Sequence, residues 1–168
     1  MAKKFGNKIH ADHIARGTFR ALRALRLDPV QEEIYGVASE MAVHKMLDLT
    51  YVFHDFHVKD DGYDVGVGGN KIEVKKIEFT KYPEGRVQQK HIADIEAGTR
   101  RPPDVFAVVM RMNGLESWEL VGWESFGNFR RHAKLKTFAS APEYPMWCMP
   151  CSEMQLPEWF AISVKSFL

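Results

Sequence analysis

The chain lacks several features that mark large classes of proteins. It has only two cysteines, Cys148 and Cys151, among 168 residues, which is too few for a disulfide framework. No apolar run approaches the roughly 18 residues that a membrane-spanning helix needs. No apolar segment follows the basic residues at the N-terminus, as it would in a secretory signal peptide. We therefore expect a soluble, intracellular (cytoplasmic) protein with no membrane partner.

Nucleotide-binding fingerprints and a strong excess of one charge are missing as well. Neither G-x-x-x-x-G-K-[ST] nor G-x-G-x-x-G occurs, and the net charge is only +1, so neither phosphate loop is expected. The charge is unevenly distributed, however. Residues 1–28 contain seven Lys or Arg and two Asp, which leaves 16 basic and 20 acidic residues in the remainder. A basic arm on a mildly acidic body is a weak indication of nucleic-acid contact.

The length predicts one domain, residues 1–168. Hydrophobic residues make up 45% of the chain, which is enough to form a core. Within the domain we distinguish a basic N-terminal arm or helix (1–28), a core (30–123) and a C-terminal extension (139–168).

The most informative stretch, residues 63–76, predicts a tight hairpin. Apolar and polar residues alternate on both sides of the Gly-Gly-Asn sequence at 68–70, which is the period of a half-buried strand. Those three residues tolerate the positive φ of a turn. A turn at the two glycines places Asp64 opposite Glu73, and a turn at Gly-Asn places it opposite Lys75. In both registers Asp64, Glu73 and Lys75 share one face of the hairpin.

Two adjacent carboxylates repel each other, and like charges directly opposite destabilise a sheet. A hard divalent cation would offset that cost, since Mg²⁺ takes carboxylate oxygens and keeps several of its waters. A surface charge pair is the simpler alternative, because Glu-x-Lys is common on strands.

Asp64 followed by Glu73-Val74-Lys75 resembles the D-x(n)-(D/E)-x-K core of the PD-(D/E)XK nuclease superfamily, which also lies on a hairpin. The chain departs from the family pattern at Tyr63, where proline is usual. The resemblance implies an α/β, restriction-endonuclease-like core, a central mixed sheet of about five strands flanked by helices. It implies a Mg²⁺ site (Mn²⁺ as a substitute) formed by Asp64, Glu73 and the Val74 carbonyl.

A third carboxylate is expected on the helix that precedes the hairpin. Asp28-Pro29 predicts a helix start, and the helix should extend to about residue 49. Glu40 points toward its apolar face, and Gly36, one turn earlier, leaves room beside it. Gly36-Val-Ala-Ser-Glu40 resembles the helical element that joins the metal site in Holliday-junction-resolvase-type members of the superfamily. The alternative is an exposed glutamate at the helix edge.

Another resemblance concerns Gln88, which falls in a predicted helix at 86–96. Several branches of the superfamily carry a glutamine there that helps to hold the active-site region, and Lys90 and His91 on the same element are candidates for phosphate contact. Two glutamines on a polar helix are also an ordinary coincidence.

Two basic segments are candidates for nucleic-acid binding, because basic side chains attract phosphates regardless of sequence. Arg16, Arg20 and Arg23 form one stripe on a predicted helix at 9–27. Arg100 and Arg101 precede two prolines that would stiffen their loop. For each segment the alternative is a solvated surface.

The remaining elements follow from local pattern. We expect strands at 50–58, 105–110 (buried on both faces) and 118–123, a turn at Asn113-Gly114, a helix at 125–135 and an irregular start to the tail at 139–168. Cys148 and Cys151 form one C-x-x-C, for which packing thiols are the preferred interpretation. Zinc would need two further ligands.

The resemblance therefore implies a metal-dependent deoxyribonuclease in which Lys75 orients or deprotonates a metal-bound water, or stabilises charge on the phosphate. Three alternatives stay open. They are a dimeric endonuclease that resolves Holliday junctions, a catalytically inactive nuclease fold that binds nucleic acid, and a zinc-containing scaffold.

Overall fold

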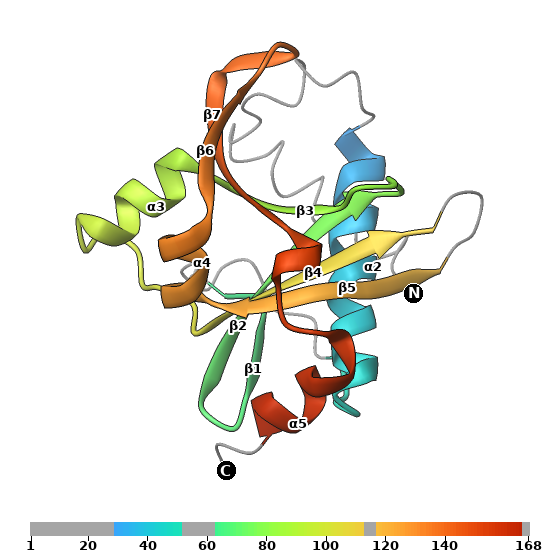
Figure 1. The fold of residues 1–168 in the computed structure, drawn as a ribbon. Helices are drawn as coiled ribbons and strands as arrows, with labels where there is room; N and C mark the ends of the chain where they lie inside the picture. The colour runs from blue at the N-terminus through green and yellow to red at the C-terminus, as the bar shows by residue number, and fades with distance from the viewer. Residues whose placement is uncertain (1–28, 52–62, 113–116, 166–168) are drawn as a thin grey trace.

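The computed structural model describes residues 29–51, 63–112 and 117–165 (Figure 1). The helices are α2 (Pro29–Met46), α3 (Gln89–Glu96), α4 (Phe126–His132) and α5 (Phe160–Lys165), with short 3-10 turns at Cys151–Glu153 and Pro157–Trp159. The strands are β1 (Val65–Val67), β2 (Asn70–Glu78), β3 (Glu84–Gln88), β4 (Val105–Arg111), β5 (Trp118–Ser125), β6 (Lys134–Phe138) and β7 (Ala141–Pro150).

The first sheet has the strand order β1-β2-β4-β5. Strands β2 and β4 are parallel, with Ile72 beside Val105, and the other two pairings are antiparallel. A parallel pair requires a crossover, and here the crossover contains both β3 and α3.

The predicted hairpin is confirmed in the first of its two registers. Val67 pairs with Asn70, and the turn consists of Gly68 and Gly69, with φ values of 56° and 82°. Two consecutive positive φ values define a type I′ turn, whose twist matches that of the strands. Glycine is needed at these positions because a Cβ disfavours positive φ.

Strand β4 is buried on both faces, as its apolar sequence predicts. Val105, Ala107 and Val109 belong to a hydrophobic cluster with α2 and α5, whereas Phe106 and Val108 belong to a second cluster. Alternate residues of a strand point to opposite faces, so the two clusters lie on opposite faces of the first sheet.

The second sheet, with the order β3-β7-β6, is antiparallel throughout. Its Val87 and Met149 pack with residues of α3 and α4 in the second hydrophobic cluster. In Figure 1 the β6–β7 ribbon rises from the first sheet on the side opposite the β1–β2 hairpin. Among the described helices none is long and apolar enough to cross a membrane.

Several predicted elements need correction. The predicted sheet of about five strands is a four-stranded mixed sheet, and a separate three-stranded sheet accompanies it. The helix predicted at 86–96 is strand β3 followed by α3, and the helix predicted at 125–135 ends at His132, where β6 follows. The tail predicted to begin irregularly forms β7 from residue 141. Strand β3 escapes a local prediction because its partner β7 is distant in sequence, whereas β6 and β7 form a hairpin with Phe138 opposite Ala141.

Two predicted elements are confirmed with shifted ends, and three further predictions concern residues outside the described ranges. Helix α2 begins at Pro29 as predicted but ends at Met46, three residues early. Strand β5 extends two residues beyond the predicted strand. The helix at 9–27, most of the strand at 50–58 and the turn at Asn113-Gly114 lie outside the described residues.

Candidate active site

Asp64 lies at an edge of strand β2, directly before β1 begins. Strand β1 covers only Asn70 to Ile72 of its neighbour. The next amide along that edge, Val74 N–H, donates a hydrogen bond to Asp64 Oδ2 over 2.6 Å, and the Asp64 amide donates to the Ile72 carbonyl over 2.9 Å. The aspartate side chain therefore continues the pairing that β1 leaves unfinished.

The Val74 carbonyl points toward the same edge. In a strand the N–H and C=O of one residue point to the same side, and the Val74 N–H meets Asp64 there. A carboxylate and a backbone carbonyl are thus directed to one place by backbone geometry alone.

Glu73 is buried, with 6% of its surface exposed, and basic side chains surround its carboxylate. The Lys75 ammonium donates to Oε1, since residues two apart share a face of the strand. The Arg100 guanidinium donates to Oε2 over 3.1 Å and to Oε1 over 3.4 Å. A buried carboxylate needs such partners, and Lys75 and Arg100 supply them.

Arg100 is held in place by the C-terminal end of helix α3. Gly98 has a φ of 72° and ends the helix. The amides of Thr99 and Arg100 then both donate to the Asp94 carbonyl, over 2.9 and 3.1 Å. This turn directs the Arg100 side chain back over β2 to Glu73.

Glu40 reaches the same region from helix α2. Burial and, to a smaller extent, the nearby negative charge of Asp64 raise the pKa of its carboxyl to about 8. The Tyr51 hydroxyl donates to Glu40 Oε2 over 3.1 Å, and this bond together with Lys76 opposes the shift. Glu40 is therefore near enough to Asp64 for the two carboxyl groups to repel each other, and its role in a metal site stays a prediction.

Tyr51 was not predicted as a site residue. Its ring lies edge-on to that of His44, with centroids 5.0 Å apart, and His44 lies one helical turn after Glu40. Burial and the Glu40 carboxyl both raise the pKa of the Tyr51 hydroxyl, so it remains a hydrogen-bond donor. A tyrosine in a segment of β-branched and aromatic residues gives no sequence signal for this role.

His91 of helix α3 borders the basic side of the site. Burial lowers its pKa, the charges of Lys75 and Arg100 lower it further, and Glu73 and Asp94 oppose them. The imidazole is therefore neutral at neutral pH, and it lies beside Glu73 and its two cations.

These contacts place three acidic side chains around the part of β2 that β1 does not cover. Glu73 and Lys75 share one face of β2, but the Asp64 carboxylate lies at the strand edge, where it bonds the Val74 amide. This corrects the prediction that all three side chains share one face. Glu40 approaches from α2. Within the residues that the structure describes, no three His, Cys, Asp or Glu side chains converge into a complete ligand set. The residue types nevertheless fit a hard cation, because carboxylate and carbonyl oxygens are the ligands that Mg²⁺ prefers.

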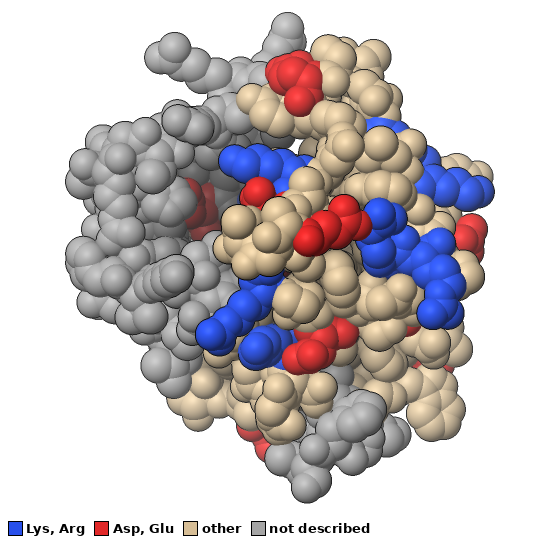
Figure 2. All heavy atoms as spheres, turned by 90° about the vertical axis from the view of Figure 1, so that its left-hand side faces the viewer, with Lys and Arg blue, Asp and Glu red and all other residues tan. Residues whose placement is uncertain are grey.

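The remaining predicted residues are dispersed. Gln88 is the last residue of β3 rather than part of a helix, and it lines a pocket with residues of β7. Arg101 is exposed beside the half-buried Arg100. Arg16, Arg20 and Arg23 lie outside the described residues. Figure 2, which views the molecule from the α3 and α4 side, shows Lys and Arg side chains in several separate groups with acidic side chains between them.

Cys148 and Cys151 are both buried free thiols. Burial raises the pKa of each thiol, in the case of Cys151 to about 11. Cys151 packs in the second hydrophobic cluster.

No protein-family model, no curated protein and no solved structure matches this chain.

Proposed function

We propose that the chain is a metal-dependent nuclease of the PD-(D/E)XK type that hydrolyses phosphodiester bonds, with DNA as the substrate that the resemblance implies. The observation that carries the proposal is the bond from Val74 N–H to Asp64 Oδ2. It joins the aspartate to the Glu73-Val74-Lys75 strand at the position where the motif requires it. The coupling of Asp64 to Glu40 supports the proposal from a separate helix.

The order of elements also agrees with a restriction-endonuclease-like core. Helix α2 precedes the hairpin, and α3 lies in the crossover between the parallel strands β2 and β4. The second sheet, which contains β3, would be an addition to that core.

In this mechanism Asp64, Glu73 and the Val74 carbonyl would hold Mg²⁺, with Glu40 completing the site. A bound Mg²⁺ supplies a water of lowered pKa and polarises the phosphoryl oxygen. Lys75 orients that water or stabilises the charge that develops on the phosphate. Arg100 lies where it can exchange its bond to Glu73 for one to a phosphate oxygen, because guanidinium binds both groups in the same geometry.

A catalytically inactive nucleic-acid-binding protein is the second candidate, and the Glu73–Arg100 ion pair favours it. An arginine that neutralises the buried carboxylate permanently would leave no need for a metal ion. Calorimetric titration with Mg²⁺ and Mn²⁺ separates the two, since only the enzyme binds a metal through Asp64 and Glu73.

The proposed activity is tested by incubating the protein with supercoiled plasmid, linear duplex, single strand and a four-way junction. Each substrate receives Mg²⁺, Mn²⁺ or a chelator. We expect cleavage with either metal, none with the chelator, and none by Lys75→Ala. Lys81→Ala is the matched control, because Lys81 lies on an exposed turn with its ammonium over the ring of Tyr82. Absence of cleavage of all four substrates, or full activity in Lys75→Ala, contradicts the proposal.

A further inference from the structure

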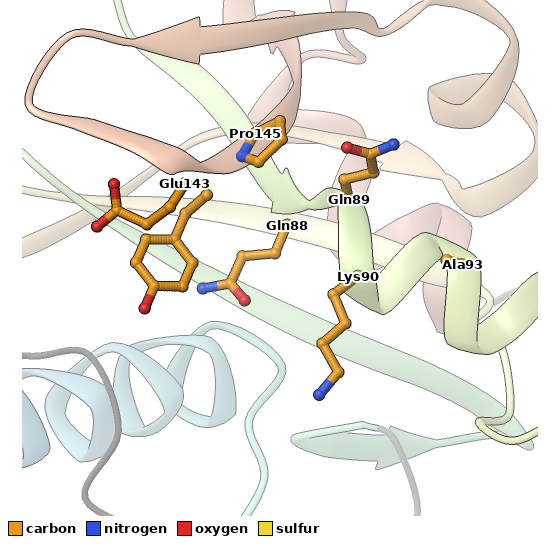
Figure 3. Close-up of a pocket in the computed structure, with 7 residues that line it drawn as sticks. Gln88, Gln89, Lys90, Ala93, Glu143 and Pro145 are labelled. Atoms are coloured by element: carbon orange, nitrogen blue, oxygen red, sulfur yellow. The ribbon is translucent and has the colours of Figure 1, made fainter.

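A pocket of about 410 Å³ lies where the end of β3 and the start of α3 meet β7 (Figure 3). Gln88 pairs with Met146 of β7, which brings the residues just before Met146 against the first turn of α3. Gln88, Gln89 and Lys90 line one side of the pocket, and Glu143, Tyr144 and Pro145 line the other.

The lining offers hydrogen-bonding groups for which the described part of the chain provides no partner. Gln88 stands at the N-cap position of α3, yet its side chain makes no capping bond. Within the described residues, the structure shows no hydrogen bond from the side chains of Gln88, Gln89 or Tyr144. In Figure 3 the Gln88 side chain extends alongside the segment that carries Glu143, and Lys90 extends away from it.

The charge of the lining favours a neutral ligand over an anion. Lys90 and Glu143 cancel each other formally, and Glu143 opposes the entry of a phosphate. A glutamine amide presents a donor beside an acceptor, which matches the paired donor and acceptor on the edge of a nucleobase. A half-buried tyrosine ring supplies a stacking surface. An unpaired base meets both conditions, because it has a donor and an acceptor on its edge and a flat face that can stack on the tyrosine ring.

The pocket also adjoins the candidate active site. Lys90, which lines the pocket, lies in the first turn of α3, and Arg100, which bonds Glu73 over 3.1 Å, follows the end of the same helix. One short helix thus borders both places, so a strand with its base in the pocket has its backbone directed toward Lys90 and the carboxylates.

We propose that this pocket binds an unpaired nucleobase of a nucleic-acid strand, next to the phosphate that the carboxylate site cleaves. The inference rests on the proposed function, and it names the substrate class of that site as single-stranded or locally unpaired nucleic acid. Duplex with no unpaired base cannot fill the pocket, because its bases are stacked and paired.

The test is binding of a fluorescein-labelled single-stranded DNA oligonucleotide, measured by fluorescence anisotropy in a chelator so that no cleavage occurs. We expect Tyr144→Ala to weaken binding about tenfold, the size expected for one lost base–aromatic stack. Gln88→Ala, an exposed residue whose truncation spares the core, should weaken it about threefold. Tyr82→Ala and Gln155→Ala, exposed residues that do not line the pocket, should bind as the unaltered protein does.

Unchanged binding in both pocket variants overturns the inference. So does an equal loss for the matching duplex, and so does a free nucleoside monophosphate that competes as strongly as the oligonucleotide. The readout does not require catalysis. If no substrate is cleaved but Tyr144→Ala loses strand binding, the proposed reaction fails and the pocket stands. If cleavage occurs but both variants bind normally, the pocket fails and the reaction stands.

Discussion

The Val74 amide donates to Asp64 Oδ2 over 2.6 Å, which makes the aspartate side chain a continuation of the β-sheet. This bond fixes the position of the Asp64 carboxylate. A carboxylate that occupies a ladder position is held along the strand edge toward which the Val74 carbonyl also points. Asp64 therefore has a structural bond and a proposed metal-binding role at once.

A pair of variants separates the structural role of Asp64 from its proposed metal-binding role. Asp64→Asn keeps an oxygen that accepts from Val74 N–H, whereas Asp64→Ala removes it. Both variants relieve the repulsion of Glu40, so their difference isolates the hydrogen bond, and Asp64→Ala should be less stable than Asp64→Asn by about 1 kcal/mol in urea unfolding. Both should lose Mn²⁺ affinity at least about tenfold by calorimetry. Asp64→Asn binding Mn²⁺ as the unaltered protein does would remove Asp64 from the metal site.

Arg100 is predicted to have opposite effects on two kinds of ligand. Its bond to Glu73 competes with a metal ion for the same oxygens. Arg100→Ala should therefore raise Mn²⁺ affinity by about tenfold without DNA, and it should weaken DNA binding in the presence of Ca²⁺ because a phosphate contact is lost. Arg101→Ala, its exposed neighbour, should leave metal affinity unchanged and affect only DNA binding. A decrease of metal affinity in Arg100→Ala would show that the ion pair preorganises Glu73 rather than competing for it.

The raised pKa of Glu40 predicts a pH-dependent stability of the metal-free protein. The folded chain keeps the Glu40 proton up to a pKa of about 8, whereas the unfolded chain loses it near 4.5. The unfolded state therefore binds fewer protons between these values, so this group lowers stability as pH rises from about 4.5 to about 8. Burial, Asp64 and Glu33 maintain the shift, and Tyr51 and Lys76 oppose it.

Glu40→Gln should remove that dependence. In chelator at pH about 8, its free energy of unfolding should exceed that of the unaltered protein by between about 1 and 4 kcal/mol, since one pKa unit corresponds to about 1.4 kcal/mol. Near pH 5 the two proteins should be nearly equal. Glu158→Gln, at an exposed position, is the control. A difference between Glu40→Gln and the unaltered protein that does not change with pH would contradict the assigned environment.

Two glycines test how the sheets pack. A Cβ at Gly85 of β3 would collide with Met154 and lie 3.0 Å from Val108 Cγ2, whereas a Cβ at Gly36 of α2 meets nothing within 4 Å. Gly85→Ala should therefore destabilise the protein by about 1–3 kcal/mol. Gly36→Ala should stabilise it by about 0.5–1 kcal/mol, because alanine is the better helix former. Equal effects of the two substitutions in thermal or urea unfolding would be inconsistent with the packing of β3 on β4.

The parts of the fold that sequence predicts are those with local causes. The Gly68-Gly69 turn and its alternating flanks determine the hairpin register, in which Val65 pairs with Ile72. The apolar run from Val105 determines a strand buried on both faces. Pro29 determines where α2 begins. In each case the residues that decide the structure lie within a few positions of one another.

The second sheet has no comparable local signal. Strand β3 is short and ends in a run of polar residues that also suits a helix, and its partner β7 begins more than fifty residues later. Strand β7 contains Pro142 and Pro145, which argue against a central strand. Both prolines precede Met146, where pairing with β3 begins, and they lie between Ala141 and Met146, where the pairing with β6 is irregular. A third proline, Pro150, ends the strand.

The candidate site likewise contains features that the local sequence predicts and features that it does not. Strand parity predicts that Glu73 and Lys75 share a face, but it does not predict that the Asp64 side chain turns to the strand edge and bonds the Val74 amide. The approach of Glu40 follows from its apolar neighbours on α2. The bond of Arg100 to Glu73 depends instead on the Gly98 turn and on the crossover that returns α3 over β2. No spacing in the sequence encodes that meeting, and the same holds for Tyr51 and Glu40.

The most direct test of the central claim is the rate at which Glu73→Gln cleaves labelled DNA with Mg²⁺, compared with the unaltered protein under single-turnover conditions. Glutamine retains an oxygen for Lys75 and Arg100, so circular dichroism and thermal unfolding should show a folded protein. We expect a rate lower by on the order of 10³-fold. A folded Glu73→Gln protein that cleaves DNA at the rate of the unaltered protein would contradict it.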